Sequence, residues 1–383
     1  MPFARARMDI ARRRLAAQHL TRAPFATVTA LVHAQGAVQA QDFGAAKWAL
    51  GLRCRGATDA AMDVALAEGT ILRTHVLRPT WHFVLPADIR WMLRLTAPRI
   101  AATMAPYDRQ LGLDAAVIRR SNAALARALA GGVQLTRASI STILARSRLP
   151  VDTISLAHLL MRAELDEVVC SGPRTAKQFT YALFDERVPP SPELGRDESL
   201  AELTRRYFTA RGPATPRDFA WWSGLTVADA RRGIEAVGEA LEASVIDGIA
   251  YWAPSAKPAV RQPSSPSAHL LPNYDEYFIG YRDRGAILER AHAARAMGSV
   301  ALTAHVIEVD GQVVGGWRRT AKKGLVTVEL HPVVRLSAAE RDAVAIAAER
   351  YGAFLELPVA IDWKSMPAAR VAPGSGWQRG VLR

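Results

Sequence analysis

The sequence contains very little cysteine. Cys54 and Cys170 are the only two in 383 residues, which excludes a disulfide framework and any zinc site built from several cysteines. No run of about 18 apolar residues occurs, so we expect no transmembrane helix. The basic N-terminal segment lacks the long apolar stretch of a secretory signal. We therefore expect a cytoplasmic protein that does not attach to a membrane.

Several widespread catalytic motifs are also absent. The sequence has no Walker loop, no HExxH, no GxSxG and no tandem CxxC, and this removes the common hydrolase and nucleotidase classes. Its nine histidines are scattered, with no pair at a convincing ligand spacing. We therefore predict that the protein holds no metal ion and uses no cofactor.

What the sequence does have is positive charge. Lysine and arginine number 49 against 36 aspartate and glutamate, which gives a net charge of +13. A chain this basic is typical of proteins that bind an anionic partner, above all nucleic acid. The hydrophobic fraction of 50% is that of a globular protein. A length of 383 residues allows two or three domains, or repeated modules.

Helices followed by a β-hairpin recur along the chain. Helices are expected at 10–19, 26–34, 42–52 and 58–68, and a β-branched and aromatic stretch at 71–85 predicts a hairpin that turns at Arg78 and Pro79. A second hairpin is expected at 167–183. A third is expected at 244–252, with Asp247 and Gly248 at its turn. Helices closed by a hairpin describe a winged helix, in which the hairpin is the wing.

We therefore predict a mainly α protein with small β-hairpins, of the α+β class, with three tandem winged-helix modules and a small C-terminal α+β domain. The expected modules are 1–100, 101–190 and 191–253, followed by a linker and the C-terminal domain at 254–383. A Pro/Ser-rich stretch at 254–267 predicts the linker. Beyond it we expect a hairpin at 306–317, a strand at 325–330 and a long amphipathic helix at 337–355.

Short motifs, in order over nearly the whole chain, resemble one family. The first is Gln39-Ala40-Gln41-Asp42 with Ala46-Lys47-Trp48-Ala49-Leu50, and others lie at 77–82, 211–215, 218–225, 271–277 and 280–284. Each piece alone is weak, but the ordered set is similar to the AlkZ-type winged-helix DNA glycosylases.

The resemblance implies three winged helices that surround damaged, alkylated double-stranded DNA. It also implies a Gln-x-Gln motif at the base-excision site, which Gln39 and Gln41 match. A sister branch carries Gln-x-Asp, but here the aspartate is Asp42, one residue too late for that pattern. The implied activity is that of a monofunctional glycosylase, which hydrolyses the N-glycosidic bond of cationic N-alkylated purines of the N7-alkylguanine or N3-alkyladenine type. Interstrand cross-links are a further candidate substrate.

The chemistry of two glutamines fits such a substrate. A Gln amide is neutral and is no general base near pH 7, but two of them can orient a water molecule. Their carbonyl dipoles can stabilise the positive charge that develops on the sugar. An alkylated purine is already cationic, so no acid has to protonate it. Side chains two residues apart share a face only in an extended segment, so Gln39 and Gln41 should not lie in a regular helix. The alternative is that both amides cap the next helix or bind loop backbone.

Three residues of the first predicted wing are candidate DNA contacts. Arg78 can bind a phosphate, Thr80 lies beside it, and His82 can bind a phosphate or a flipped nucleotide. Because side chains alternate along a strand, we expect Trp81 and Phe83 to pack inward and Thr80 and His82 to face solvent. Exposure without DNA contact is the alternative.

An acidic and aromatic group near residue 280 supplies second-tier candidates for the site: Tyr274, Asp275, Glu276 and Tyr281. Asp275 and Glu276, together with Asp283, could hold a metal ion or act as acid and base. The alternative is a structural network with Arg282 and Arg284 that docks the C-terminal domain near the DNA.

Other basic residues have weaker claims. Lys47 is the only lysine near the motif, but its expected place on a helix beside Trp48 makes it a poor Schiff-base nucleophile, and a monofunctional enzyme needs none. Arg12 and Arg13 either lie along DNA phosphates or form a solvated helix face.

Two other functions compete with the glycosylase. One is a winged-helix DNA-binding protein without catalysis, such as a regulator. Several modules in one chain argue against a repressor, which usually dimerises on a palindromic site, and we expect a monomer. The other is an enzyme that acts independently of nucleic acid through Asp275 and Glu276.

Overall fold

The first part of the chain consists of helices closed by a hairpin. The computed structural model describes residues 2–21, 24–256, 265–290 and 305–365. The elements of this part are α1 (Pro2–Ala17), α2 (Val28–Gln35), β1 (Val38–Gln39), α3 (Phe43–Gly51), α4 (Asp59–Glu68), β2 (Leu72–His75) and β3 (Trp81–Val84). Asp42 and Thr58 cap α3 and α4 through side-chain oxygens that accept from backbone N–H groups. These starts and the first hairpin confirm the sequence prediction.

The next two parts repeat this order. The second has α5 (Pro86–Gln110), α6 (Ala115–Leu129), β4 (Leu135–Thr136), α7 (Arg137–Arg146), α8 (Thr153–Leu165), β5 (Val169–Ser171), β6 (Thr180–Leu183) and α9 (Phe184–Arg187). The third has α10 (Arg196–Arg211), α11 (Pro216–Ser223), α12 (Val227–Val237), the 3-10 turn η1 (Gly238–Ala240), β7 (Leu241–Ile246) and β8 (Ile249–Pro254).

The small sheets of the three parts share one topology. The strand orders are β1-β3-β2 and β4-β6-β5, so an early strand pairs with the last strand of the hairpin. In the third part, Ala214 makes the equivalent bridge to Trp252 of β8. The recurring order of helices and hairpin was therefore predicted correctly. The module boundaries at 100, 190 and 253 stay a prediction.

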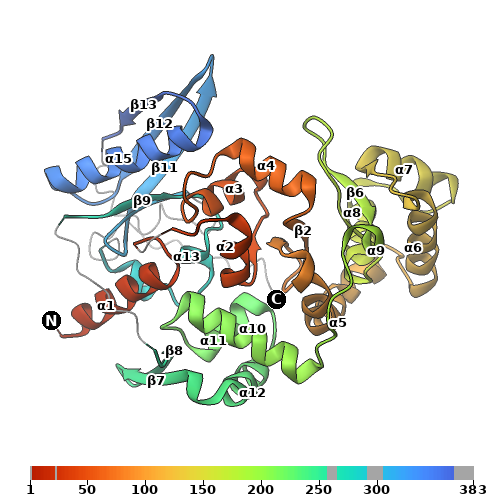
Figure 1. Cartoon of the computed structure of the whole chain (residues 1–383), viewed down its shortest axis with the longest axis horizontal. Helices are drawn as coiled ribbons and strands as arrows, with labels where there is room; N and C mark the ends of the chain where they lie inside the picture. Colours follow the sequence, from red (N-terminus) through yellow and green to blue (C-terminus); the bar gives the residue numbers. More distant parts are fainter. Residues whose placement is uncertain (1, 22–23, 257–264, 291–304, 366–383) are drawn as a thin grey trace.

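The C-terminal part is built on a five-stranded sheet. It contains β9 (Ala268–Leu271), α13 (Glu276–Ile279), the 3-10 turn η2 (Gly285–Ile287), β10 (Val306–Val309), β11 (Gln312–Lys322), β12 (Leu325–Pro332), α15 (Ala338–Leu355) and β13 (Val359–Trp363). The strand order is β13-β12-β11-β10-β9, and α15 covers one face of the sheet (Figure 1). The predicted hairpin, strand and long helix are confirmed. The core of the predicted linker, 257–264, lies outside the described residues.

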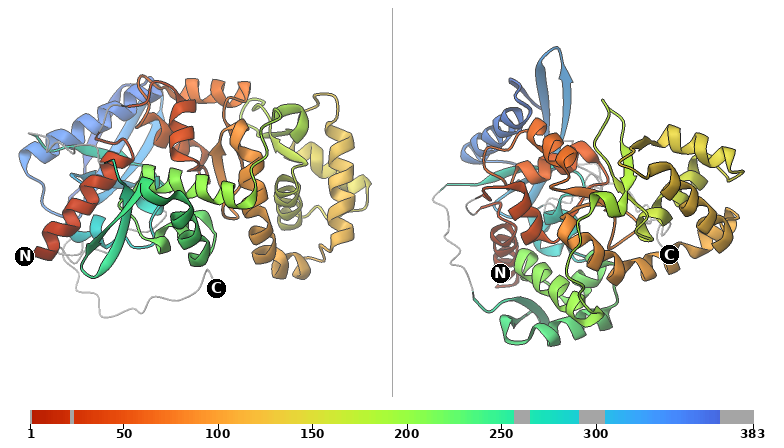
Figure 2. Two further views of the ribbon diagram at one scale, coloured as in Figure 1. Left: turned by 60° about the horizontal axis from the view of Figure 1, so that its bottom comes forward. Right: turned by 45° about the vertical axis from the view of Figure 1, so that its right-hand side comes forward.

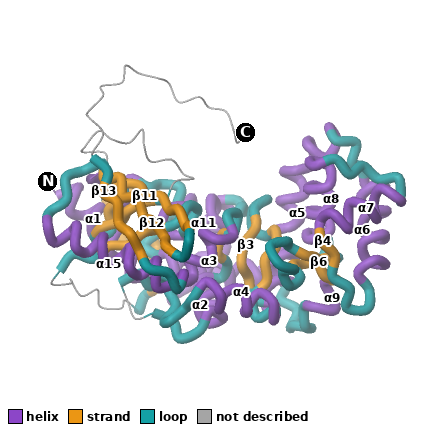
Figure 3. The backbone as a smooth tube through the Cα atoms, turned by 90° about the horizontal axis from the view of Figure 1, so that it is seen from above, coloured by secondary structure: helices purple, strands orange, loops and turns teal. Residues whose placement is uncertain are grey.

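The larger hydrophobic clusters lie between and within these parts. One joins α2, α3 and Phe83 of β3 to the C-terminal sheet. A second joins Val84 of β3 to α5, α10 and α11, and a third lies within the second part. In Figures 2 and 3, α6 to α8 accordingly form a lobe at one end of the molecule, opposite the five-stranded sheet. Within the described segments, no helix is long and apolar enough to cross a bilayer.

Candidate functional site

The Gln-x-Gln motif lies in an extended segment. Gln39 ends β1, and Gln41 follows in an irregular stretch before α3. The prediction that this segment is not regular helix is confirmed. Gln39 stands opposite His82 in the antiparallel pair of β1 and β3, and His82 stands opposite Thr74 of β2. Directly opposed side chains share a face, with Cβ atoms about 5 Å apart. Gln39, His82 and Thr74 therefore form one row across the sheet.

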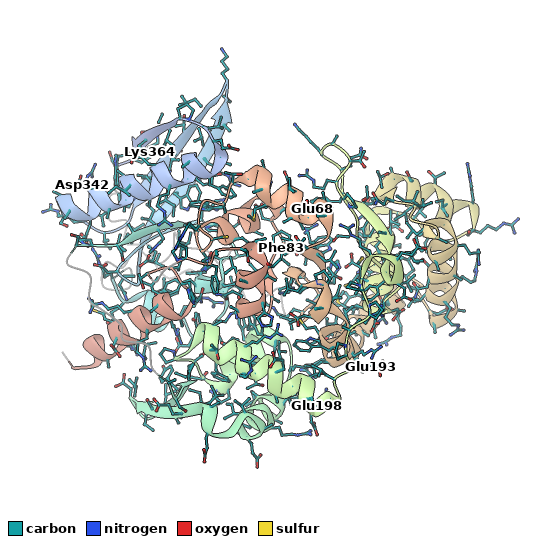
Figure 4. The ribbon with its side chains drawn as sticks, in the orientation of Figure 1. Glu68, Phe83, Glu193, Glu198, Asp342 and Lys364 are labelled. Atoms are coloured by element: carbon teal, nitrogen blue, oxygen red, sulfur yellow. The ribbon has the colours of Figure 1, made fainter. Side chains whose placement is uncertain are left out.

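Both faces of this sheet are covered, and this determines the burial of β3. Phe83 packs in the cluster with α3, whereas Val84 packs in the cluster with α10 and α11. His82 lies on the Val84 face and is 0% exposed. The expectation that His82 faces solvent is wrong, because alternation along a strand assumes one open face. Phe83 is buried as expected and lies near the middle of the molecule (Figure 4). Trp81 and Thr80 are both partly exposed.

The side chain of Gln39 is fixed by Arg78. Arg78, in the turn of the first hairpin, donates from Nη2 to Oε1 of Gln39 at 2.6 Å. A guanidinium has only donors, so this contact sets the amide with its oxygen toward Arg78. Oε1 keeps a second lone pair for another donor. Burial lowers the pKa of Arg78, but the group remains a cation.

The backbone of Gln39 is held by Glu276. Its N–H donates to Oε1 of Glu276 at 2.9 Å. Oε2 of Glu276 accepts from Nη2 of Arg211 at 2.7 Å and from the indole of Trp222 at 2.9 Å. Arg211 also donates to the Ala37 carbonyl, just before the motif. Glu276 is 1% exposed, and both of its oxygens accept hydrogen bonds within the protein. This second-tier candidate therefore holds the backbone of the motif in place.

The other members of the acidic group are also structural. Asp275 forms a two-fold contact with Arg53 at 2.8 and 2.9 Å. Tyr281 is buried and donates to the Arg211 carbonyl, and Tyr274 packs against the first cluster. The predicted network exists, but its expected partners Arg282 and Arg284 are wrong: Glu276 and Asp275 pair with arginines from α10 and the segment after α3.

Arg73, which sequence reasoning missed, supports the middle of the motif. Its Nε donates to the Ala40 carbonyl at 3.0 Å. Its guanidinium lies 4.4 Å from the ring centre of Trp81 and 4.6 Å from that of Phe179, and burial lowers the pKa of Arg73 to about 10. Phe179 comes from the second hairpin, so this stack ties the second part of the chain to the motif. Gln41 is exposed, and its Oε1 accepts from the Trp81 N–H at 3.4 Å.

His82 is a neutral acceptor inside the site. Burial, with the charge of Arg78, lowers the pKa of His82 well below its usual value. Nδ1 lies 2.9 Å from the Thr80 carbonyl, so Nδ1 carries the proton and Nε2 carries the lone pair. Among the described residues, Nε2 of His82 and the hydroxyls of Thr74 and Thr80 are buried without a hydrogen-bond partner. Unpaired buried polar atoms of this kind are usually satisfied by water or a ligand.

The remaining candidates lie elsewhere. Lys47 is buried, with Nζ 2.7 Å from Asp59 and 3.1 Å from Asp63 of α4. Two carboxylates hold this amine, which suits a structural role. Arg12 and Arg13 are partly exposed on α1, which packs against η2 and α10.

Comparison with known proteins identifies the class. A family model described as "DNA glycosylase AlkZ-like" matches residues 32–354, and the chain belongs to this family of DNA glycosylases. An "Interstrand DNA cross-link repair glycosylase" of Streptomyces sahachiroi is 24% identical over 350 residues, which are 85% of this chain and 90% of that protein. The solved structure of the Streptomyces sahachiroi DNA glycosylase AlkZ has the same fold, with a TM-score of 0.73 at 22% identity over 92% of this chain and 98% of that one.

The family decides between the competing functions. A DNA glycosylase acts on damaged DNA, so the enzyme prediction is confirmed over a non-catalytic regulator. An enzyme that acts independently of nucleic acid through Asp275 and Glu276 is wrong for the same reason, and the ion pairs of both carboxylates agree with this.

Proposed function

We propose that this DNA glycosylase excises cationic N-alkylated purines from duplex DNA by hydrolysis, with Gln39 and Gln41 as the catalytic residues. The observation that carries the proposal is the fixed amide of Gln39, set by Arg78 at its side chain and by Glu276 at its backbone. A transition state is stabilised best by dipoles that are already in place before the reaction.

The proposed reaction needs no protein acid. The bond between C1′ and the purine nitrogen breaks, and its electron pair neutralises the alkylated base. Carbonyl dipoles of Gln39 and Gln41 face the sugar cation, and a water molecule adds to C1′ and loses one proton to solvent. His82 stays neutral in this scheme, because its environment opposes a second positive charge.

The protein is further proposed to act as a monomer, and Arg78 and Thr80 to contact the DNA near the lesion. Arg12 and Arg13 of α1 are proposed as more distant phosphate contacts. Interstrand cross-links are proposed as a second substrate class, because the relative from Streptomyces sahachiroi carries that activity in its name.

The test is release of 7-methylguanine from methylated duplex DNA, measured by chromatography and mass spectrometry. Gln39→Ala with Gln41→Ala should abolish release while DNA binding remains. Gln110→Ala, an exposed glutamine at the end of α5, is the matched control and should release base at the wild-type rate. Release that survives the double substitution would refute the catalytic assignment.

A further inference from the structure

Most arginines of the interior have a carboxylate partner. The four most deeply buried pairs are Arg14 with Asp218, Arg53 with Asp275, Arg206 with Asp88 and Arg211 with Glu276. Pairing is expected, because a guanidinium removed from water without a counter-charge destabilises the fold.

Arg73 departs from this pattern but stacks on Trp81 and Phe179 and donates to the Ala40 carbonyl. Arg78 and Arg284 also depart from it. Within the described parts of the chain, neither forms an ion pair, and Nε of Arg78 and Nη2 of Arg284 are buried donors without an acceptor. Burial lowers the pKa of both groups, that of Arg284 to about 10. The charge of Glu276 raises the pKa of Arg78, and for Arg284 the charge of Asp218 raises the pKa while that of Arg78 lowers it. The two cations therefore repel each other, and the nearby carboxylates Asp218 and Glu276 pair with Arg14 and Arg211 instead.

Trp221 brings the two guanidiniums together. Its ring centre lies 5.9 Å from Arg78 and 5.5 Å from Arg284, and its indole N–H is fixed on the Ile279 carbonyl at 2.9 Å. Trp221 is partly exposed, as are Arg78 and Arg284, whereas the neighbouring Trp222 is 0% exposed. The first hairpin, α11 and the segment after α13 thus each contribute one side chain.

We propose that Arg78 and Arg284, arranged around Trp221, form a binding site for the phosphodiester backbone of DNA at the damaged nucleotide. Neither guanidinium has a direct ion-pair partner among the described residues, and each keeps one buried donor nitrogen without an acceptor. Such donors favour an anion, and the planar fork of arginine matches a phosphate. DNA, the substrate of the family, supplies phosphates at every nucleotide.

The site is coupled to the catalytic residue. Nη2 of Arg78 holds Oε1 of Gln39 at 2.6 Å, so a phosphate on Arg78 sets the adjoining sugar next to Gln39. The same phosphate offsets a positive charge that would otherwise oppose the sugar cation. This coupling rests on the proposed function of Gln39, whereas the phosphate site itself requires only that the protein binds DNA.

The binding test uses the full chain and a duplex with a tetrahydrofuran abasic nucleotide, followed by fluorescence anisotropy over a range of KCl concentrations. Each phosphate contact contributes about 0.9 to the magnitude of the slope of log K against log salt. One contact therefore strengthens binding about eightfold when the salt concentration falls from 1 M to 0.1 M. Arg78→Gln and Arg284→Gln should each lower the slope by about one unit. Arg232→Gln, an exposed arginine already paired with Asp197, is the control and should keep the wild-type slope. Wild-type slopes in both site variants would overturn the proposal.

Two further measurements separate the alternatives. Arg284→Gln breaks no ion pair, but it loses the hydrogen bond from Nε to the Phe278 carbonyl at 2.7 Å, so its Tm should stay close to the wild-type value. If Arg284→Gln nevertheless misfolds, Arg284→Lys replaces it in the test and should keep the wild-type salt slope but bind DNA more weakly. Wild-type affinity of Arg284→Lys would refute the need for the planar guanidinium. In single-turnover base release at saturating DNA, Arg284→Gln should recover the wild-type rate and Arg78→Gln should stay slow. Full recovery in both would refute the coupling to Gln39. A wild-type protein that shows the slopes but releases no alkylpurine would refute the proposed function and leave the phosphate site standing.

Discussion

Replacement of Glu276 by glutamine distinguishes a structural from a catalytic carboxylate. Glu276 accepts four hydrogen bonds: one from the Gln39 N–H, two from Arg211 and one from Trp222. Arg211 is 0% exposed. Glu276→Gln preserves the shape of the side chain but removes the only carboxylate that pairs with Arg211 within the described residues.

The expected effect is large. Loss of one partner of a buried ion pair leaves an uncompensated charge and costs about 3–5 kcal/mol. The amide also brings an NH₂ group toward donors that need an acceptor, so its full cost lies at the upper end of that range. Because the Gln39 N–H loses a charged acceptor, base release by the folded fraction should fall as well.

The assay is urea unfolding followed by circular dichroism, beside base release at a temperature where the variant is folded. Glu193→Gln is the matched control: Glu193 lies at the surface and pairs with Arg94, and Figure 4 shows it at the margin of the molecule. We expect the unfolding midpoint of this control to be unchanged. If Glu276→Gln kept wild-type stability but lost base release, the structural account of Glu276 would be refuted in favour of an acid or base.

Substitutions at three other residues test the site. The lowered pKa of His82 means that the unfolded chain binds a proton more readily, so the free energy of unfolding should fall as pH drops below about 6.5, with a slope of up to about 1.4 kcal/mol per pH unit. His82→Gln should remove that part of the pH dependence in urea titrations; an unchanged profile would show that His82 is not held neutral. Borohydride should trap no covalent complex with DNA in the wild type or in Lys47→Ala, and a trapped wild-type complex would make the enzyme bifunctional. Arg73→Ala should slow single-turnover release by about tenfold to a hundredfold, because Ala40 loses its support, and Arg73→Lys should not restore it, since an ammonium lacks the planar stack.

The local parts of the fold were predictable because their signals are local. Asp42 and Thr58 cap helices where the sequence places them, and Asp247 with Gly248 turns the third hairpin. The long helix α5 was not assigned, and it contains Pro98 and Pro106, residues that ordinarily end helices. β9 and β13 are completed by partners far along the chain, which no local pattern reveals.

The candidate site also has features that the local sequence predicts and features that it does not. The extended conformation of the motif followed from the geometry of two side chains on one face. The contact between Gln39 and Glu276 spans 237 residues, and the burial of His82 depends on α10 and α11 closing over the sheet. These contacts arise from packing between distant parts of the chain. The sequence therefore yields a list of candidate residues but does not distinguish the structural carboxylates Asp275 and Glu276 from the neutral residues Gln39 and His82.

The distribution of charge bears on how a very basic chain could catalyse the proposed reaction, in which a sugar cation forms that nearby positive charges would destabilise. Behind the motif, carboxylates pair with Arg53 and Arg211, and these two guanidiniums only shape the backbone. Arg78, in contact with Gln39, has no ion-pair partner in the described structure, and Glu276, which raises its pKa, pairs directly with Arg211. In the scheme that we propose, the charge of Arg78 disfavours a sugar cation at Gln39 in the DNA-free enzyme, and a phosphate of the bound DNA offsets that charge. In that scheme, the binding of the DNA substrate itself removes the electrostatic opposition to the sugar cation.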